Sequence, residues 1–383
     1  MHSAYCAGVK KIELSYTFGA REAGAQAIRN PLIELLHAVR IQGSIAGAAR
    51  STGKSYRHVW GQLKRWEAEL ARGLIVWDKG QPARLSEFAD KLLWAEQQAQ
   101  ARLAPQIEAL HADLERVFAV AYDDTAHVLT LYASHDDALV ALREHAAAQA
   151  RLHLDIYFTG SVDAIGALNE GRCVLSGFHT APQPARAGTA RPARTLAQRT
   201  YQPLLQPGRH KIIGFARRTQ GLVVARGNPL RLETMADLFS RRARFVNRPL
   251  GTGTRLLAQD LLAQAGLPAD AIDGWDRTEP SHAAVAQAVA SGTADTGLAI
   301  EAAARSRGLG FVPLVQETYY LVCLRSALEE PPMLALRNVL RSSEWLARMA
   351  QLPGYQAFRS GEVLSLRREL PWWSPTPAKK SAG

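Results

Sequence analysis

The hydrophobic pattern of residues 31–70 predicts three short helices. Apolar side chains recur every three or four positions from Leu32 to Val39, and Gly43 ends this run. Ser44 stands where an N-cap belongs, ahead of a short Ala-rich helix over Ile45 to Arg50. Ser55 is placed as the cap of a third helix, whose apolar face consists of Tyr56, Val59, Leu63, Trp66 and Leu70. A helix, a short turn and a second helix are the outline of a helix-turn-helix.

Two short strands and one long helix are predicted next. Residues 74–77 and 83–85 flank a turn at Asp78 to Pro82, which is the pattern of a β-hairpin wing. From Ser86 onward a helical seam contains Phe88, Leu92, Ala95, Ala99, Leu103, Ile107, Leu110, Leu114 and Val117. Such a helix would extend for about 45 Å, and its seam favours a partner helix, with packing against its own domain as the alternative. Pro105 should kink it.

After Asp124 the pattern changes to strands that alternate with helices. The predicted strands cover residues 128–132, 152–158, 221–225, 243–247, 296–300 and 319–324. The predicted helices cover residues 138–150, 161–169, 254–265, 281–290 and 334–349. This alternation predicts a mostly parallel sheet with helices on its faces. Residues 182–207, rich in Pro, Ala and Arg, are interpreted as a long basic loop, and the residues from Pro371 as a tail.

The composition indicates the net charge of the protein and the cell compartment in which we expect it. The 383 residues suffice for two or three domains, and a formal net charge of +11 raises the expectation of a polyanionic partner. Cys6, Cys173 and Cys323 lie too far apart in sequence to indicate a disulfide framework or a metal site. Met1 to Phe18 lacks the pattern of an export signal, and no apolar run is long enough to span a bilayer. We therefore expect a cytoplasmic protein without a membrane contact.

Two stretches of the sequence resemble known families. The hexapeptide from Ser55 to Trp60 resembles the recognition helix of ModE-type molybdate-responsive regulators, and Gly43 to Ala49 is similar to both ModE-type and LysR-type winged helices. This likeness spans Pro31 to Leu93. The molybdate-binding β-barrels of ModE are not recognisable here, and Val128 to Leu324 instead resembles a PBP-like (type II periplasmic-binding-protein) domain. The strings that carry this second likeness are residues 133–136, 159–161, 221–229, 244–255, 281–282 and 294–298, and Tyr319.

The resemblance implies an order of domains. It places an N-terminal extension at residues 1–30 and a winged helix-turn-helix DNA-binding domain at 31–85. A linker or dimerisation helix would follow at 86–122, then an effector-binding domain at 123–370 and a tail at 371–383. The expected fold class is therefore an all-α/winged-helix N-terminal domain with a long linker helix, followed by an α/β two-lobed type II periplasmic-binding-protein-like domain.

The third helix and its surroundings supply the candidate DNA contacts. Arginine can bind guanine edges and glutamine suits adenine, so Arg57 and Gln62 are candidates for reading bases. Trp60 is expected in the core, and a merely solvated surface is the alternative for the polar residues. The predicted DNA-binding set is Ser44, Lys54, Ser55, Tyr56, Arg57, His58, Gln62, Arg65 and Arg84. Further phosphate contacts are expected from Arg40, Arg50, Lys64, Arg72 and Lys79.

The candidate effector contacts come from helix starts. Ser134, Ser161, Thr252, Thr254 and Ser281 stand at predicted helix N-termini, where free N–H groups attract anions, although ordinary N-caps are the alternative for each. The predicted effector-binding set is Ser134, His135, Ser161, Arg248, Thr252, Gly253, Thr254, Arg255, His282 and Tyr319. Of the two arginines, Arg248 is favoured because it directly follows a strand.

The expected effector is a small anion, and no metal site or covalent cofactor is expected. The resemblance implies molybdate, tungstate or a molybdenum-cofactor-related ligand, and arginine would also suit a small carboxylate such as formate. An enzyme is disfavoured, because Ser134, His135 and Asp136 are adjacent and their side chains should diverge; no catalytic residue is predicted. A transport protein would need export, and an architectural DNA binder would leave the crevice without a purpose.

Together these features predict a transcription regulator that binds double-stranded DNA as a homodimer or homotetramer. A small anion would control it, in connection with molybdenum-linked metabolism or transport. The alternative is a non-regulatory ligand-binding protein, or an uncharacterised enzyme that uses the same crevice.

Overall fold

The N-terminal unit is a winged helix, as predicted. The computed structural model describes residues 30–77, 82–123, 125–182 and 194–373, so the predicted contact Lys79 and the N-terminal extension up to residue 29 lie outside them. The unit contains α1 (Pro31–Gln42), α2 (Ile45–Ser51), α3 (Tyr56–Leu70) and the antiparallel strands β1 (Ile75–Val76) and β2 (Arg84–Leu85). Ser44 and Ser55 cap α2 and α3 by accepting hydrogen bonds from the backbone N–H groups of Gly47 (3.0 Å) and His58 (3.1 Å).

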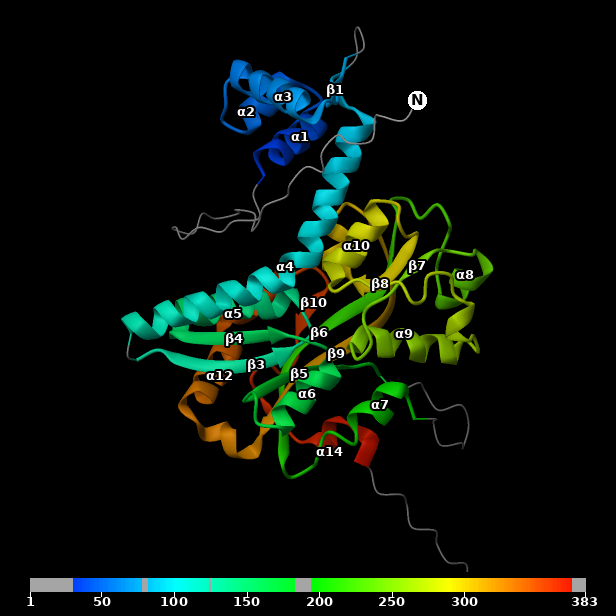
Figure 1. Ribbon diagram of the computed structural model, residues 1–383. Coiled ribbons are helices and arrows are strands. Elements are labelled where there is room, and N and C mark those ends of the chain that lie inside the picture. The colour runs from blue at the N-terminus through cyan, green and yellow to red at the C-terminus, as the bar shows by residue number, and fades with distance from the viewer. Residues whose placement is uncertain (1–29, 78–81, 124, 183–193, 374–383) are drawn as a thin grey trace, which may run out of the picture.

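A single helix, α4 (Glu87–Tyr122), joins the winged helix to the rest of the protein. It is 36 residues long and contains Pro105. Figure 1 shows it descending from the winged helix and bending sharply where it meets the α/β domain, which confirms the predicted kink. Beyond the bend it packs along strand β4 (Leu152–Phe158), and before the bend it contacts helix α10 (His282–Ala290).

The α/β domain is organised by two long antiparallel strands, β6 (His210–Val224) and β9 (Gly310–Leu324). The other strands are β3 (His127–Ala133), β5 (Leu175–Thr180), β7 (Phe245–Val246), β8 (Thr296–Ile300), β10 (Tyr355–Ala357) and β11 (Val363–Leu364). The strand order is β4-β3-β5-β9-β6-β8-β7, and β10 and β11 pair with β6. The sheet is mixed, because β6 and β9 run antiparallel to their neighbours, so the prediction of a mostly parallel sheet is wrong.

Helices cover both faces of this sheet (Figure 1). They are α5 (Asp137–Ala150), α6 (Ser161–Asn169), α7 (Leu196–Tyr201), α8 (Met235–Ser240), α9 (Gly253–Gln264), α10, α11 (Glu301–Arg305), α12 (Pro331–Arg341), α13 (Ser343–Ala350) and α14 (Leu366–Glu369). We call the part formed around β3, β4 and β5 lobe I and the part formed around β7 and β8 lobe II. The strands β6 and β9 pass through both lobes, with irregularities in register at Gly214/Ala216 and Gln220/Gly221.

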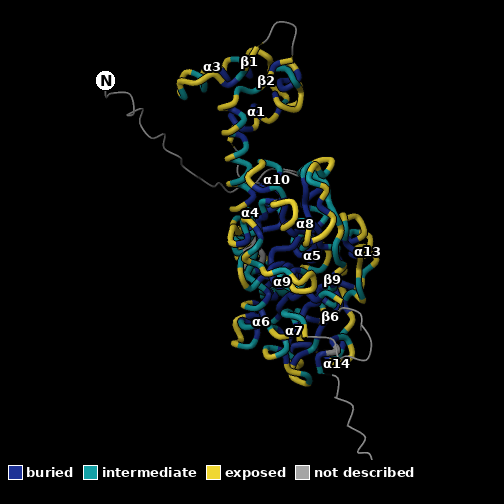
Figure 2. The backbone as a smooth tube through the Cα atoms, turned by 90° about the vertical axis from the view of Figure 1, so that its right-hand side faces the viewer, coloured by how far each residue is buried: buried dark blue, intermediate teal, exposed yellow. Residues whose placement is uncertain are grey.

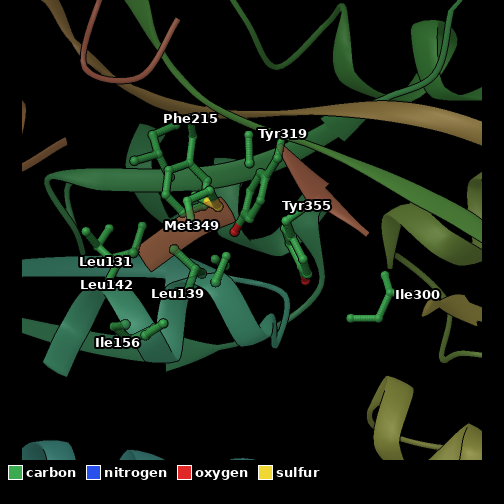
Figure 3. Packing of buried hydrophobic residues seen from close by; sticks show 14 of the residues in the cluster. Leu131, Leu139, Leu142, Ile156, Phe215, Ile300, Tyr319, Met349 and Tyr355 are labelled. Atoms are coloured by element: carbon green, nitrogen blue, oxygen red, sulfur yellow. The ribbon is translucent and has the colours of Figure 1, made fainter. Parts of the chain in front are cut away.

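Each lobe has apolar side chains packed on the sheet. In lobe I, Phe215, Tyr319 and Met349 lie together beside Leu139 and Leu142 (Figure 3). In lobe II, a separate cluster contains Leu238, Phe245 and Trp275. Figure 2 shows these buried segments in the interior of the domain, whereas α3 of the winged helix is largely exposed. The first cluster also contains Val285 of α10 and Ile300 of β8, so the two lobes share apolar packing as well as the long strands, and only the second cluster is confined to lobe II.

Three predicted elements need correction. The segment 182–207 is not loop throughout, because it contains α7, capped by Thr195. The predicted helix over 334–349 is two helices, since Ser342 has an extended backbone (ψ 147°) and caps α13. Trp372, predicted in the tail, is buried, and its ring lies 6.4 Å from that of Tyr201.

Replacing Trp345 should destabilise lobe I strongly. Its side chain is fully buried and stacks on Phe215 at a ring separation of 6.1 Å. Trp345→Ala should lower the free energy of unfolding by about 3–5 kcal/mol, because it leaves a large cavity. The half-exposed neighbour Leu346 provides the control Leu346→Ala. Urea denaturation measures both, and equal losses in the two variants would contradict this packing.

Candidate functional site

The two lobes meet where α6 and α9 begin. A Cβ added to Gly160, just before α6, would lie 2.9 Å from the backbone carbonyl carbon and oxygen of Gly251, just before α9. The backbone N–H of Val162 donates to the carbonyl of Gly251 at 3.3 Å. We call this junction, where Gly160 meets Gly251, the crevice. The side chains around it are enclosed between the two lobes.

Arg248 places an uncompensated charge in the crevice. It lies two residues after the end of β7, is 3% exposed, and its Nε and Nη1 atoms have no hydrogen-bond partner among the described residues. Burial, and to a smaller extent the charge of Arg218, lower the pKa of Arg248 to about 9, so it is still mostly protonated near pH 7. A buried charge without a counter-ion costs several kcal/mol, roughly, and a bound anion would offset that cost.

Two neutral histidines lie near this charge. Burial holds the pKa of both His179 and His282 well below the usual value, and the nearby charges of Arg218 and Arg248 act in the same direction. His282 is the first residue of α10, and its Nδ1 has no hydrogen-bond partner among the described residues. Both ring nitrogens of His179 are likewise without one. A neutral imidazole can donate one hydrogen bond to an anion.

Hydroxyl groups complete the polar lining. The hydroxyls of Ser134 and Ser161 lie 3.3 Å apart; Ser161 begins α6, but Ser134 directly follows β3, and the predicted helix start belongs to Asp136, which caps α5. Burial raises the pKa of Tyr201, on α7, against a smaller opposing effect of the neighbouring Ser161. A Cβ added to Gly253 would lie 3.5 Å from both the Tyr201 hydroxyl oxygen and the His179 ring, so only a small residue fits there. These groups come from both lobes and from α7.

A second buried arginine is fully compensated. Arg218, on β6, donates from Nε to Glu317 at 2.5 Å and also pairs with Asp136, whose Oδ2 accepts as well from the Tyr355 hydroxyl (3.0 Å). Gln220 donates both to Glu317 (3.0 Å) and to the Thr254 hydroxyl (2.9 Å), which connects the network to lobe II. Two carboxylates thus neutralise Arg218, whereas no carboxylate among the described residues forms an ion pair with Arg248.

Several predicted effector residues have structural partners instead. Arg255 is not a surface residue: it lies on the Trp275 ring at 4.2 Å and donates to the Trp275 carbonyl at 2.7 Å. Thr252 caps α9 and Thr254 binds Gln220. His135 pairs with Glu108 of α4 at 3.1 Å. Tyr319 stacks on His179, and its hydroxyl points toward Gly177 in lobe I.

Sequence reasoning missed His179, Tyr201 and the Arg218 network. His179 is the penultimate residue of the buried strand β5, and a polar residue at the carboxyl end of a buried strand is a signal that could have been used. Tyr201 lies in the segment interpreted as loop, where nothing in the local pattern distinguishes it.

The candidate DNA contacts lie on an exposed face of the winged helix. Lys54, Arg57, His58 and Arg84 are exposed, and Gln62 is half-buried. Arg65 is exposed and pairs with Glu69 at 3.2 Å on the same helix. The exposed Tyr56 stacks on Trp60, whose half-buried ring packs against the helical core. Ser44 and Ser55 act as caps, which leaves their oxygens engaged with the backbone.

Two kinds of site are not found within the described residues. No three His, Cys, Asp or Glu side chains in that part of the chain lie close enough together to hold a metal ion. No helix there combines the length and the apolar character needed to cross a membrane.

Among curated proteins, the chain is similar to two uncharacterized bacterial ones. It is 29% identical over 208 residues to the protein YvgK of Bacillus subtilis, which covers 54% of this chain and 64% of that protein. The chain thus spans slightly less than two thirds of this relative. It is 28% identical over 111 residues to a protein encoded in the 5′ region of a ferredoxin 2Fe-2S gene of Clostridium pasteurianum, covering 29% of this chain and 98% of that protein.

Solved structures that match most of this chain do so at low identity. OxyR from Corynebacterium glutamicum, in an H2O2-bound mutant form, matches over 87% of this chain and 98% of its own, at 14% identity and a TM-score of 0.41. CbnR, described as a LysR family transcriptional regulator, matches over 79% and 96%, at 17% identity and a TM-score of 0.36.

The family comparison gives a direct assignment. A family profile described as the PBP superfamily domain matches residues 142–341, which extend from α5 to the end of α12 and include both lobes. Because these residues are more than half of the chain, the protein belongs to the PBP superfamily domain family.

Proposed function

We propose that this protein is a DNA-binding transcription regulator of LysR-like organisation, in which a small anion bound in the crevice controls the winged helix. The observation that carries the proposal is the uncompensated charge of Arg248 in the crevice, in a chain whose other end is a winged helix with exposed cationic residues on α3. Exposed arginines and lysines supply phosphate and base contacts to DNA, and a buried arginine supplies the counter-charge for an anion.

Within this proposal, a tetrahedral oxyanion is the effector that fits best. Arg248, His282, the serine pair and Tyr201 approach the crevice from both lobes and from α7. A tetrahedral oxyanion accepts hydrogen bonds in all directions, whereas a planar carboxylate such as formate offers two oxygens in one plane. We therefore propose molybdate, with tungstate or a molybdenum-cofactor-related ligand as close alternatives, and a role in molybdenum-linked metabolism or transport.

The polar residues that could suggest catalysis support binding instead. Asp136 is engaged by Arg218 and Tyr355, His135 by Glu108, and Ser134 by Ser161. An acyl-transfer relay needs the serine and the carboxylate to share one histidine, and the contacts of these three residues lead in different directions.

Arg248→Met should remove anion binding without unfolding the protein. Molybdate at a hundredfold its dissociation constant should stabilise the wild type by about 2.7 kcal/mol, and this gain should vanish in the variant. Without anion, the variant should be at least as stable as the wild type, because an unpaired buried charge has been removed. Thermal unfolding with molybdate, tungstate, sulfate, phosphate and formate measures both effects.

Arg255→Met is the matched control. Arg255 is equally buried in lobe II but has the Trp275 carbonyl and ring as partners. This variant should lose stability and keep its response to the anion. A wild-type protein that responds to none of these anions, or an Arg248→Met variant that keeps the response, would contradict the proposed site.

Arg57→Ala should weaken binding to DNA fragments selected from a random pool by the wild-type protein. A lost base contact costs about 1–3 kcal/mol, and the preference at one position should relax. Lys54→Ala should instead weaken binding to all sequences and reduce the salt dependence by about one counter-ion. Fluorescence anisotropy at several salt concentrations measures both. Arg241→Ala, at an exposed position of lobe II, is the charge-matched control, and an equal loss there would contradict this DNA surface.

We also propose a homodimer formed through α4. Leu110 (43% exposed) and Val117 (59% exposed) belong to the predicted seam and lie in the part of α4 beyond the bend. They are one heptad apart, so both are on the same side of the helix. A heptad-spaced apolar face on a long helix is typical of a surface that pairs with a second helix.

Val117→Glu should shift the protein from dimer to monomer, because it places a charge in the apolar seam. Sedimentation velocity at micromolar concentration measures the change, with the exposed neighbour His111→Glu as control. A monomeric wild type, or a dimer that Val117→Glu leaves intact, would exclude this interface.

A further inference from the structure

Helix α4 is bonded to lobe II at the point where Pro105 interrupts its hydrogen-bond ladder. Proline has no N–H, so the carbonyl of Ala101, four residues earlier, lacks its helical donor. The Ser281 hydroxyl donates to this carbonyl at 3.2 Å. Ser281 is the N-cap of α10 and directly precedes His282 of the crevice. The bend of the helix thus coincides with a contact to the effector site.

A charged clamp holds the same segment of α4 to lobe II. Glu279 is 4% exposed, and its carboxylate accepts two hydrogen bonds from Arg102 (2.6 and 2.8 Å) and one from Gln98 (3.0 Å). The backbone N–H of Glu279 donates to the carbonyl of Asn247 at 2.9 Å, one residue before Arg248. A bidentate arginine–carboxylate pair fixes orientation as well as distance.

Beyond the bend, α4 is bonded to lobe I. The carboxylate of Glu108 lies 3.1 Å from Nε2 of His135, and the backbone carbonyl of Glu108 accepts from Arg143 at 3.0 Å. About two helical turns after Glu108, Arg116 donates to the buried Asp155 of β4 at 3.1 Å. His135 directly follows Ser134 of the crevice. The two lobes are therefore attached to α4 on opposite sides of Pro105.

We infer that α4 converts movement between the lobes into movement of the winged helix. Since one lobe holds the helix before Pro105 and the other holds it after, a change in the angle between the lobes must change the bend or break one of the two attachments. The winged helix lies at the far end of the segment held by lobe II (Figure 1). This inference rests on the proposed function only for the identity of the signal that closes the lobes.

The lobes can be locked together without any effector. A Cβ at Gly251 would lie 4.0 Å from the Cβ of Val162, which is within the range for a disulfide. The double variant Val162→Cys/Gly251→Cys, made with Cys6→Ser, is locked when oxidised and free when reduced. Since both forms have the same sequence, any strain from the left-handed backbone at Gly251 (φ 81°) is common to them. Alkylation and mass spectrometry verify the bond.

Small-angle X-ray scattering then reports the position of the winged helix. The oxidised and reduced forms should differ in radius of gyration and in distance distribution. Adding Arg102→Ala, which removes the clamp on Glu279, should make the two curves coincide. Adding Lys91→Ala, which removes an ion pair within α4 that touches neither lobe, should leave the difference intact.

A glycine substitution gives an independent route should the lock variant not fold. Gly160→Ala places a Cβ against the backbone of Gly251, so it should hold the lobes apart and give the scattering curve of the open form. Gly166→Ala is the control, because Gly166 lies inside α6 with open space around it. This variant should give the same scattering curve as the wild type, both in molybdate and in buffer alone.

The inference is overturned by coincident curves for the locked and free forms, or by a difference that Arg102→Ala leaves unchanged. Coincident curves for Gly160→Ala and Gly166→Ala would likewise overturn it when the lock cannot be made. None of these outcomes depends on anion binding. Failure of the proposed effector therefore appears separately, as the absence of a thermal response in the wild type.

Discussion

The cost of burying a charge governs how the crevice is built. Arg218 and Arg248 are both buried, but Asp136 and Glu317 neutralise the first, and in the part of the chain that the structure describes no carboxylate pairs with the second. A protein interior retains an unpaired guanidinium only where some other interaction offsets its desolvation. Arg248 lies two residues after β7, at the junction of the lobes, and the anion that we propose would supply that interaction.

The fold places this charge at the junction of the two lobes. Strands β6 and β9 pass through both lobes, and the Arg218 network lies on them with Gln220 reaching Thr254 of lobe II. Lobe I contributes Ser134, after β3, and Ser161, at the start of α6, and lobe II contributes Arg248 and His282. An anion held by both sides would draw the lobes together, and the attachments of α4 would carry that change to the winged helix.

Local features of this fold could be predicted from the sequence, and long-range ones could not. Caps such as Ser44 and Ser55, the buried strand β4 and the kink at Pro105 depend on neighbours in sequence, and all were predicted. The N-terminal half of β6 was missed because Arg217, Arg218 and Gln220 interrupt its apolar pattern. Arg217 is exposed, but Arg218 and Gln220 are buried because both donate to Glu317, about a hundred residues away in sequence.

The candidate site shows the same division. Arg248 could be predicted as an effector contact because it follows a predicted strand. The hydrogen bond from Arg255 to the carbonyl of Trp275, twenty residues away, could not be predicted from any local pattern. Tyr201 reaches the crevice from a segment whose composition indicates a loop, because its ring is held by Phe178 and Trp372 from distant parts of the chain. Long-range packing decides which polar residues come together in the crevice, and a short stretch of sequence does not reveal that packing.

Native mass spectrometry tests the central claim most directly, because it detects a bound anion whatever its chemistry. Wild-type protein and Arg248→Met would be incubated with molybdate, tungstate, sulfate, phosphate and formate, one at a time. The account predicts one anion per chain in the wild type, for a tetrahedral oxyanion first, and none in the variant. No adduct with any of these anions, or equal adducts in both proteins, would contradict it.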